Sequence, residues 1–216
     1  MLLSAPWTIL FGPSGSGKSS ILRAACGLIP TADVTFAQTL PAPQNQPQSL
    51  ERIPPHRSNL AYAPQGTVLF PHLTVRQNVS FATDIRHQPH SPTIDAALDL
   101  FQLTPLAQRL PRDLSGGERQ RVNLARAFAV PGPHLLLLDE PFTGIDRSLR
   151  DLLLPRMQQR AAQQGIPVLS VTHDIEEALI LNAEVIRLEQ GLIVDQGPAS
   201  QVLADERARM LDVLNA

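Results

Sequence analysis

The chain is poor in cysteine, lysine and aromatic residues, and it carries no strong charge of either sign. Its single cysteine, Cys26, can form no internal disulfide, which excludes a disulfide scaffold and fits a reducing cytoplasm. The formal net charge of -2 provides no positive field, so we expect no nucleic-acid partner. No apolar run approaches the roughly 20 residues of a membrane-spanning helix, and residues 1–11 lack the basic flank of a signal peptide. The 216 residues suit one α/β domain, or a core with a small subdomain.

The only lysine, Lys18, lies in a glycine-rich segment of the form G-x-x-x-x-G-K-[ST]. Residues 7–11 predict a buried strand before it and residues 19–26 a helix after it, so backbone N–H groups can converge on phosphate oxygens. Glycine permits that approach and the positive φ angles of such turns. A chance glycine-rich turn is the alternative, but it would also have to hold the one lysine. The predicted nucleotide-binding residues here are Gly12, Pro13, Ser14, Gly15, Ser16, Gly17, Lys18, Ser19 and Ser20.

Two apolar segments end in polar side chains. Residues 134–138 have the pattern of a parallel strand buried on both faces, and they precede Asp139 and Glu140. Four leucines could also begin a core helix, but the flanking prolines leave room for little except a strand. Residues 168–171 repeat the design before His173. Ligands of open α/β sheets bind at the carboxyl ends of strands, although two solvated turn acids and a structural histidine remain the alternatives.

Two adjacent glycines open another predicted helix, in Leu114-Ser115-Gly116-Gly117-Glu118-Arg119-Gln120-Arg121. Ser115 and Glu118 form an ordinary capping box. The two glycines are poor helix formers in the first turn, so something must approach that helix end closely. An anion fits, because free N–H groups and the positive end of the helix dipole point at it.

The two glycine motifs together resemble those of the ATP-binding cassette (ABC) family, in which L-S-G-G-E-R-Q opens a helix. The resemblance implies an α/β fold of the P-loop NTPase class, with a mostly parallel sheet flanked by helices and an inserted α-helical subdomain. It implies a single ABC ATPase domain over 1–216, with a core of about 1–69 and 128–216 and a helical subdomain of about 70–127. ATP and Mg²⁺ are the cofactors that it implies.

The resemblance also assigns roles in ATP hydrolysis. Glu140 is the expected general base, His173 matches the switch histidine that contacts the γ-phosphate, and Lys18 reaches the β- and γ-phosphates. Gln65 matches the Q-loop glutamine, although the proline before it replaces the usual aromatic or aliphatic residue. The expected catalytic residues are therefore Lys18, Glu140 and His173, and the expected Mg²⁺ ligands are Ser19, Gln65 and Asp139, the last through water.

In this family Ser115, Gly116 and Gly117 meet the γ-phosphate of ATP bound to a second subunit. The resemblance thus implies a head-to-tail homodimer with two ATP molecules between the chains, and residues 143–146 resemble the D-loop that crosses this interface.

Residues 52–57, 69–75, 153–155 and 165–169 resemble the importer branch of the family, with the nearest likeness to the molybdate-importer ATPase. L-F-P-H-L also occurs in sulfate, polyamine and sugar importers, so the cargo stays open. The resemblance implies a place at the cytoplasmic face of the membrane, held by permease subunits that contact Leu69, Phe70 and Leu73, and an indirect link to a substrate-binding protein. A core wedge is the alternative role for Phe70. A non-transport ABC ATPase and a non-catalytic remnant are the alternative functions.

Two departures from the family stand out. In the 216 residues we expect no counterpart of the family's C-terminal oxyanion-sensing domain, and only eleven residues precede Gly12, where relatives place a strand pair with an aromatic residue that stacks on adenine. Trp7 is a poor substitute, because we expect it to be buried in the strand before the loop. The expectation is either that the true start lies upstream or that ATP binds weakly and with little preference over GTP.

Several local patterns predict further elements. Thr74 and Gln77 form a capping box for a helix to about residue 82, residues 93–101 predict a second helix, and Thr104 before Pro105 predicts an N-cap. Residues 185–194 predict a hairpin, a helical tail is expected from about Ser200, and residues 39–48 predict a surface loop.

Overall fold

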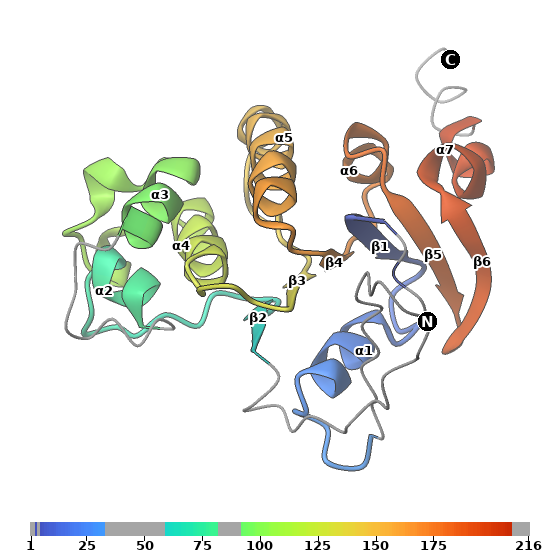
Figure 1. Ribbon diagram of the computed structural model, residues 1–216, viewed down its shortest axis with the longest axis horizontal. Helices are drawn as coiled ribbons and strands as arrows, with labels where there is room; N and C mark the ends of the chain where they lie inside the picture. The colour runs from blue at the N-terminus through green and yellow to red at the C-terminus, as the bar shows by residue number, and fades with distance from the viewer. Residues whose placement is uncertain (1–2, 4, 33–58, 82–91, 209–216) are drawn as a thin grey trace, which may run out of the picture.

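A computed structural model describes residues 3, 5–32, 59–81 and 92–208, and a six-stranded sheet lies at its centre (Figure 1). The strand order is β2-β3-β4-β1-β5-β6. All neighbours pair in parallel except β5 and β6, which form the predicted antiparallel hairpin. The mostly parallel α/β fold is therefore confirmed. The strands are β1 (Trp7–Phe11), β2 (Leu60–Ala63), β3 (Leu135–Asp139), β4 (Val168–Val171), β5 (Glu184–Glu189) and β6 (Leu192–Pro198).

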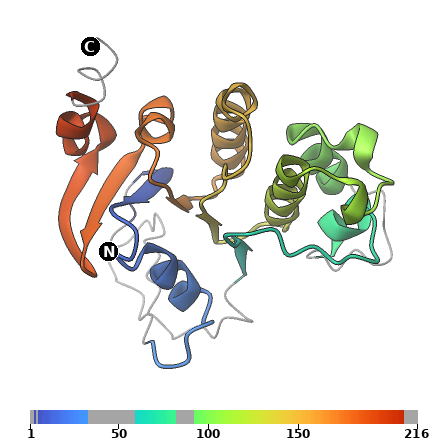
Figure 2. The ribbon, with the colours of Figure 1, turned by 180° about the vertical axis from the view of Figure 1, so that it is seen from behind.

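Helices cover both faces of the sheet (Figures 1 and 2). Alternate leucines of β3 divide between the two faces: Leu136 and Leu138 join a core with α4 and α5, whereas Leu135 and Leu137 pack in a second core with Leu22 of α1. A strand buried in this way needs an unbroken apolar sequence. The helices are α1 (Lys18–Ala25), α2 (Val75–Ser80), α3 (Pro92–Leu100), α4 (Gly116–Phe128), α5 (Arg147–Gln164), α6 (Ile175–Ile180) and α7 (Ala199–Val202).

Helices α2 and α3 lie beyond the β2 edge of the sheet, with α4 between them and the strands (Figure 1). Both predicted capping boxes are present, from Thr74 at the start of α2 and from Ser115 at the start of α4. The predicted division into a core and a helical subdomain stays a prediction. Within the ranges described, no helix combines the length and the apolar character needed to cross a bilayer.

The prediction for Thr104 is wrong. Leu103 precedes the turn with φ -105° and ψ -5°, which is helical rather than the extended conformation of a capping residue, because its N–H still closes the end of α3 on Leu98. Thr104 is instead the first residue of a short 3-10 helix, Thr104–Leu106, and a second one spans Pro111–Asp113. The helical tail is confirmed from Ala199, whereas segments 39–48 and 52–57 lie outside the described residues.

Candidate functional site

Most of the predicted site residues lie on segments that follow β1, β3 and β4, whereas Gln65 follows β2 and Ser115, Gly116 and Gly117 lie at the start of α4. These strands are neighbours and run parallel, so their carboxyl ends meet at one edge of the sheet. The glycine-rich loop follows β1, Asp139 and Glu140 stand at the end of β3, and His173 follows β4. This is the edge at which open α/β sheets bind ligands.

The glycine-rich loop needs glycine for two reasons. A Cβ atom on Gly12 would lie 2.1 Å from the carbonyl oxygen of Leu188 on β5, so no side chain fits there. Gly15 and Gly17 have φ of 82° and 95°, and Gly17 is the left-handed cap before α1. The β5–β6 turn supports the loop, because Gly191 N–H donates to the Ser16 carbonyl at 3.2 Å. Pro13, Ser14, Gly15 and Ser20 are exposed, whereas Ser16 is buried.

Lys18 places its ammonium group inside this loop. Nζ donates to the carbonyl oxygens of Gly12 and Pro13 at 2.9 and 2.8 Å, and the side chain is buried. Burial lowers the pKa of Lys18, an effect that the negative charges of Glu140 and Asp139 oppose. The loop therefore encloses a cation close to the two acids.

Asp139 is fully buried and hydrogen-bonded on both oxygens. Ser19 Oγ donates to Oδ1 at 2.8 Å, and the Tyr62 hydroxyl donates to Oδ2 at 3.4 Å. Burial raises the pKa of Tyr62 to about 12, so its hydroxyl keeps its proton. A hydroxyl and a carboxylate side by side fit Mg²⁺, which takes one or two protein ligands and completes its shell with water and phosphate. The part of the chain described holds no cluster of three or more acidic, histidine or cysteine side chains that would form an all-protein metal site.

The carboxylate of Glu140 lies close to polar side chains from three other segments. Its carboxylate accepts from Gln65 Nε2 at 3.0 Å and from Thr143 Oγ1 at 3.3 Å, and His173 Nδ1 lies 3.7 Å from Oε1. Its φ of 47° lies in the left-handed region, which costs energy for a residue other than glycine. Its backbone N–H donates to the Val171 carbonyl, so the strained residue is fixed to β4. Gln65, Glu140 and His173 thus lie together, whereas their roles in hydrolysis stay predictions.

The start of α4 has a different environment. Ser115 Oγ accepts from Glu118 N–H at 3.2 Å, and Glu118 Oε2 accepts from Ser115 N–H at 2.6 Å, so the capping box is complete. A Cβ on Gly117 would lie 2.8 Å from the carbonyl oxygen of Gly144, so the predicted close approach to Gly117 comes from this chain's own 143–146 loop. A Cβ on Gly116 would meet nothing within 4 Å. The Ser115 side chain makes no hydrogen bond to the glycine-rich loop within the described ranges.

Sequence reasoning missed four residues around the site. Tyr62 supports Asp139, and Gln120 Nε2 of α4 donates to the Pro141 carbonyl at 2.9 Å. Arg150 and the buried Glu177 lie next to the segment that carries His173. Burial raises the pKa of Glu177 to about 7. No local pattern marks Tyr62, Gln120 or Arg150, because the contacts that bring them to the site, with Asp139, the Pro141 carbonyl and Asp174, span 20 or more positions of the chain.

Comparison with known proteins gives one family. A family model described as ABC transporter matches residues 4–143. The molybdenum import ATP-binding protein ModC of Albidiferax ferrireducens is 39% identical over 199 residues, which are 91% of this chain and 53% of that protein. The sulfate/thiosulfate import ATP-binding protein CysA of Synechocystis sp. is 38% identical over 196 residues, 89% of this chain and 53% of that protein. The chain spans about half the length of the curated relatives that it matches.

Solved structures share the fold. The structure of cbiO1 from Clostridium perfringens, part of the ABC transporter complex cbiONQ, has a TM-score of 0.74 at 23% identity and covers 99% of this chain and 86% of its own. The dimeric structure of the bacterial ABC transporter cassette MJ0796 has a TM-score of 0.71 at 23% identity, covering 92% of this chain and 88% of its own. The predicted cassette fold is therefore confirmed.

Proposed function

Because the chain belongs to the ABC transporter family, we propose that it is the ATP-binding and ATP-hydrolysing subunit of an importer. The observation that carries the proposal is that Gln65 and His173 both lie at the carboxylate of Glu140. Asp139, the residue directly before Glu140, accepts a hydrogen bond from Ser19. A nucleotide-binding remnant would have no need to hold Glu140 in a strained backbone conformation beside these partners.

In this proposal the glycine-rich loop binds the phosphates of ATP. Its backbone N–H groups and the N-terminus of α1 face the anion, and Lys18 exchanges its two carbonyl contacts for the β- and γ-phosphate oxygens. Ser19 and Gln65 would hold Mg²⁺ directly, and Asp139 would hold it through water. The ion would neutralise charge that develops on the phosphate oxygens.

Glu140 is the proposed general base. Its carboxylate, beside Gln65 and His173, would accept a proton from the water that attacks the γ-phosphate. His173 is largely exposed in this structure, which leaves its ring free to contact the γ-phosphate while remaining near Glu140. Lys18, Glu140 and His173 are the proposed catalytic residues.

A second copy of the chain would complete the site. Ser115 and Gly116 form a helix start with unobstructed space at Gly116, and such a helix end attracts anions. We propose that this end of α4 meets the γ-phosphate of ATP held by the partner chain, in a head-to-tail homodimer. Gly117 would contribute its backbone N–H, while the 143–146 loop of the same chain lies against it.

Molybdate is the proposed cargo, because the relative from Albidiferax ferrireducens is named for molybdenum import, whereas the relative from Synechocystis sp. is named for sulfate/thiosulfate import. Sulfate is the competing cargo.

The chain itself would act at the cytoplasmic face of the membrane, bound to permease subunits through residues 68–73. Val68 is exposed there. Asn78 fixes this loop with hydrogen bonds to Phe70, Leu73 and Thr74. A substrate-binding protein would act on the other side, and no nucleic acid takes part.

Hydrolysis and uptake test the two halves of the proposal. The purified protein should hydrolyse Mg-ATP, and Lys18→Ala should abolish ATP binding and hydrolysis together. Uptake of labelled molybdate should fall when the gene is disrupted and return with the wild-type gene but not with Lys18→Ala. Loss of sulfate uptake alone would make sulfate the cargo, and unchanged uptake of both anions would reject an oxyanion cargo.

A further inference from the structure

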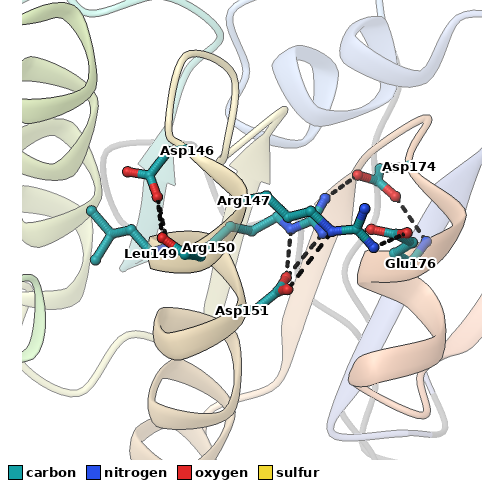
Figure 3. Close-up of polar contacts among 8 residues, drawn as sticks. Asp146, Arg147, Leu149, Arg150, Asp151, Asp174 and Glu176 are labelled. Carbon is teal, nitrogen blue, oxygen red and sulfur yellow. Dashed lines mark hydrogen bonds and ion pairs between the residues drawn. The ribbon is translucent and has the colours of Figure 1, made fainter.

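A buried arginine joins two loops of the site without reaching the site itself. Arg150 lies in the first turn of α5, and its backbone N–H donates to the Asp146 carbonyl at 2.9 Å. Its guanidinium pairs with three carboxylates (Figure 3): Nη1 with Asp174, Nη2 with Glu176 Oε2 at 2.6 Å, and Nε with Asp151 Oδ1 at 2.9 Å. The side chain is only 8% exposed, so these contacts are partly shielded from solvent.

The first loop attached to Arg150 is 143–146. Asp146 caps α5, since its Oδ1 accepts from Leu149 N–H at 2.9 Å. The same loop contributes the Thr143 hydroxyl to Glu140 and the Gly144 carbonyl to the space beside Gly117. A shift of the first turn of α5 would therefore move groups that touch both Glu140 and the start of α4.

The second loop carries His173. Asp174 follows it directly and caps α6, because Oδ1 accepts from Glu176 N–H at 2.8 Å while the Asp174 N–H donates to Thr172 Oγ1 at 3.0 Å. The other oxygen of Asp174 is the one that Arg150 binds. The position of the His173 backbone is thus set on one side by β4 and on the other by Arg150.

We infer that Arg150 is a positioning residue, which holds the 143–146 loop and the 172–174 loop at a fixed separation and so keeps His173 in line with Glu140. The inference rests on the proposed ATP hydrolysis. A planar guanidinium can bind three carboxylates at once, which a lysine ammonium does less well. A purely structural contact between α5 and α6 would need no such charges, because apolar residues often stabilise a buried position equally well.

The test compares Arg150→Met in two backgrounds. In the wild-type background we expect the single-turnover rate of ATP hydrolysis to fall about 10-fold to 100-fold, the scale of a misplaced catalytic group, with nucleotide Kd nearly unchanged. In a His173→Ala background the same change should cost almost nothing further, because the residue that Arg150 positions is gone. Single-turnover assays with radiolabelled ATP remain sensitive enough after both losses.

Matched controls separate this role from general damage. Arg156→Met removes another arginine of the same helix, which pairs with Asp99 at 3.4 Å, and should leave hydrolysis unchanged. Asp174→Asn should reproduce the Arg150→Met pattern in both backgrounds, and it takes its place if Arg150→Met fails to fold. An equal loss with and without His173, or no loss in wild type, would overturn the inference. A wild-type protein that hydrolyses no ATP would reject the proposed function first, and the inference with it.

Discussion

The two ends of the candidate site differ in how complete they are within one chain. At the carboxyl edge of the sheet, the functional side chains already touch: Ser19 binds Asp139, and Gln65 binds Glu140. At the start of α4, the capping box satisfies its own residues and Gly116 faces open space. At the carboxyl edge of the sheet the side chains are therefore already paired, whereas at the start of α4 Gly116 stays open within the part of the chain that the structure describes. The difference favours a site assembled from two chains.

The largest effect on hydrolysis should come from a change at the carboxyl edge of the sheet. Glu140→Gln removes the proposed base while retaining a polar group for Gln65 and Thr143, so turnover should fall by about 10² to 10⁴ and ATP affinity should persist. Glu189→Gln, on an exposed carboxylate of β5, is the control and should be silent. Steady-state hydrolysis and nucleotide titration measure the two quantities. Parent-rate hydrolysis by Glu140→Gln would show that the base lies elsewhere.

The start of α4 should matter for hydrolysis only after two chains associate. Gly116→Asp places a carboxylate where a Cβ has free space, so the fold should persist, but the charge should repel the partner's nucleotide. Hydrolysis should fall about 10²-fold, the scale of a lost phosphate-binding donor, with unchanged ATP affinity of the single chain. Gly116→Ala is the matched control and should retain most activity. A loss of single-chain affinity in Gly116→Asp would place this residue in the first site instead.

The free energy of unfolding should depend on pH through the buried carboxyl group of Glu177, next to the segment that carries His173. Burial is the main cause that raises the pKa of Glu177 from 4.5 to about 7; Asp174 and Glu140 add to the rise, and Thr172 and Arg150 oppose it. The folded chain then keeps a proton that the unfolded chain releases, so the free energy of unfolding should fall by up to about 3 kcal/mol as pH rises from 5 to 8. Glu177→Gln should flatten this dependence in urea titrations at the two pH values. An equally steep dependence in the variant would assign it to other groups.

The smallest effect distinguishes the two neighbouring glycines. Gly117→Ala drives a Cβ against the Gly144 carbonyl and should lower the free energy of unfolding by about 1–3 kcal/mol. Gly116→Ala should raise it by about 0.5–1 kcal/mol, because alanine loses less backbone entropy in a helix. Thermal unfolding of both variants measures the contrast. Equal stability would mean that the 143–146 loop does not press on α4.

The sequence predicts the features that neighbouring residues determine. The glycine-rich loop, the acids after β3 and both capping boxes each depend on a few adjacent positions, and each folds as expected. The sequence does not predict helix α5, because Pro155 interrupts its pattern, although its buried face still repeats at helical spacing in Leu153, Leu154, Met157 and Ala161. Contacts such as Tyr62 to Asp139 and Arg150 to Asp174 join separate elements, so only the folded chain reveals them.

Sedimentation velocity of the Glu140→Gln chain, with and without Mg-ATP, tests the assembly of one site from two chains most directly. The variant should bind ATP without consuming it, so we expect a monomer without nucleotide and a dimer with it. Adding Gly116→Asp should abolish the dimer while ATP still binds. A Glu140→Gln chain that binds ATP and stays monomeric at every concentration, or a dimer that tolerates Gly116→Asp, would contradict the account.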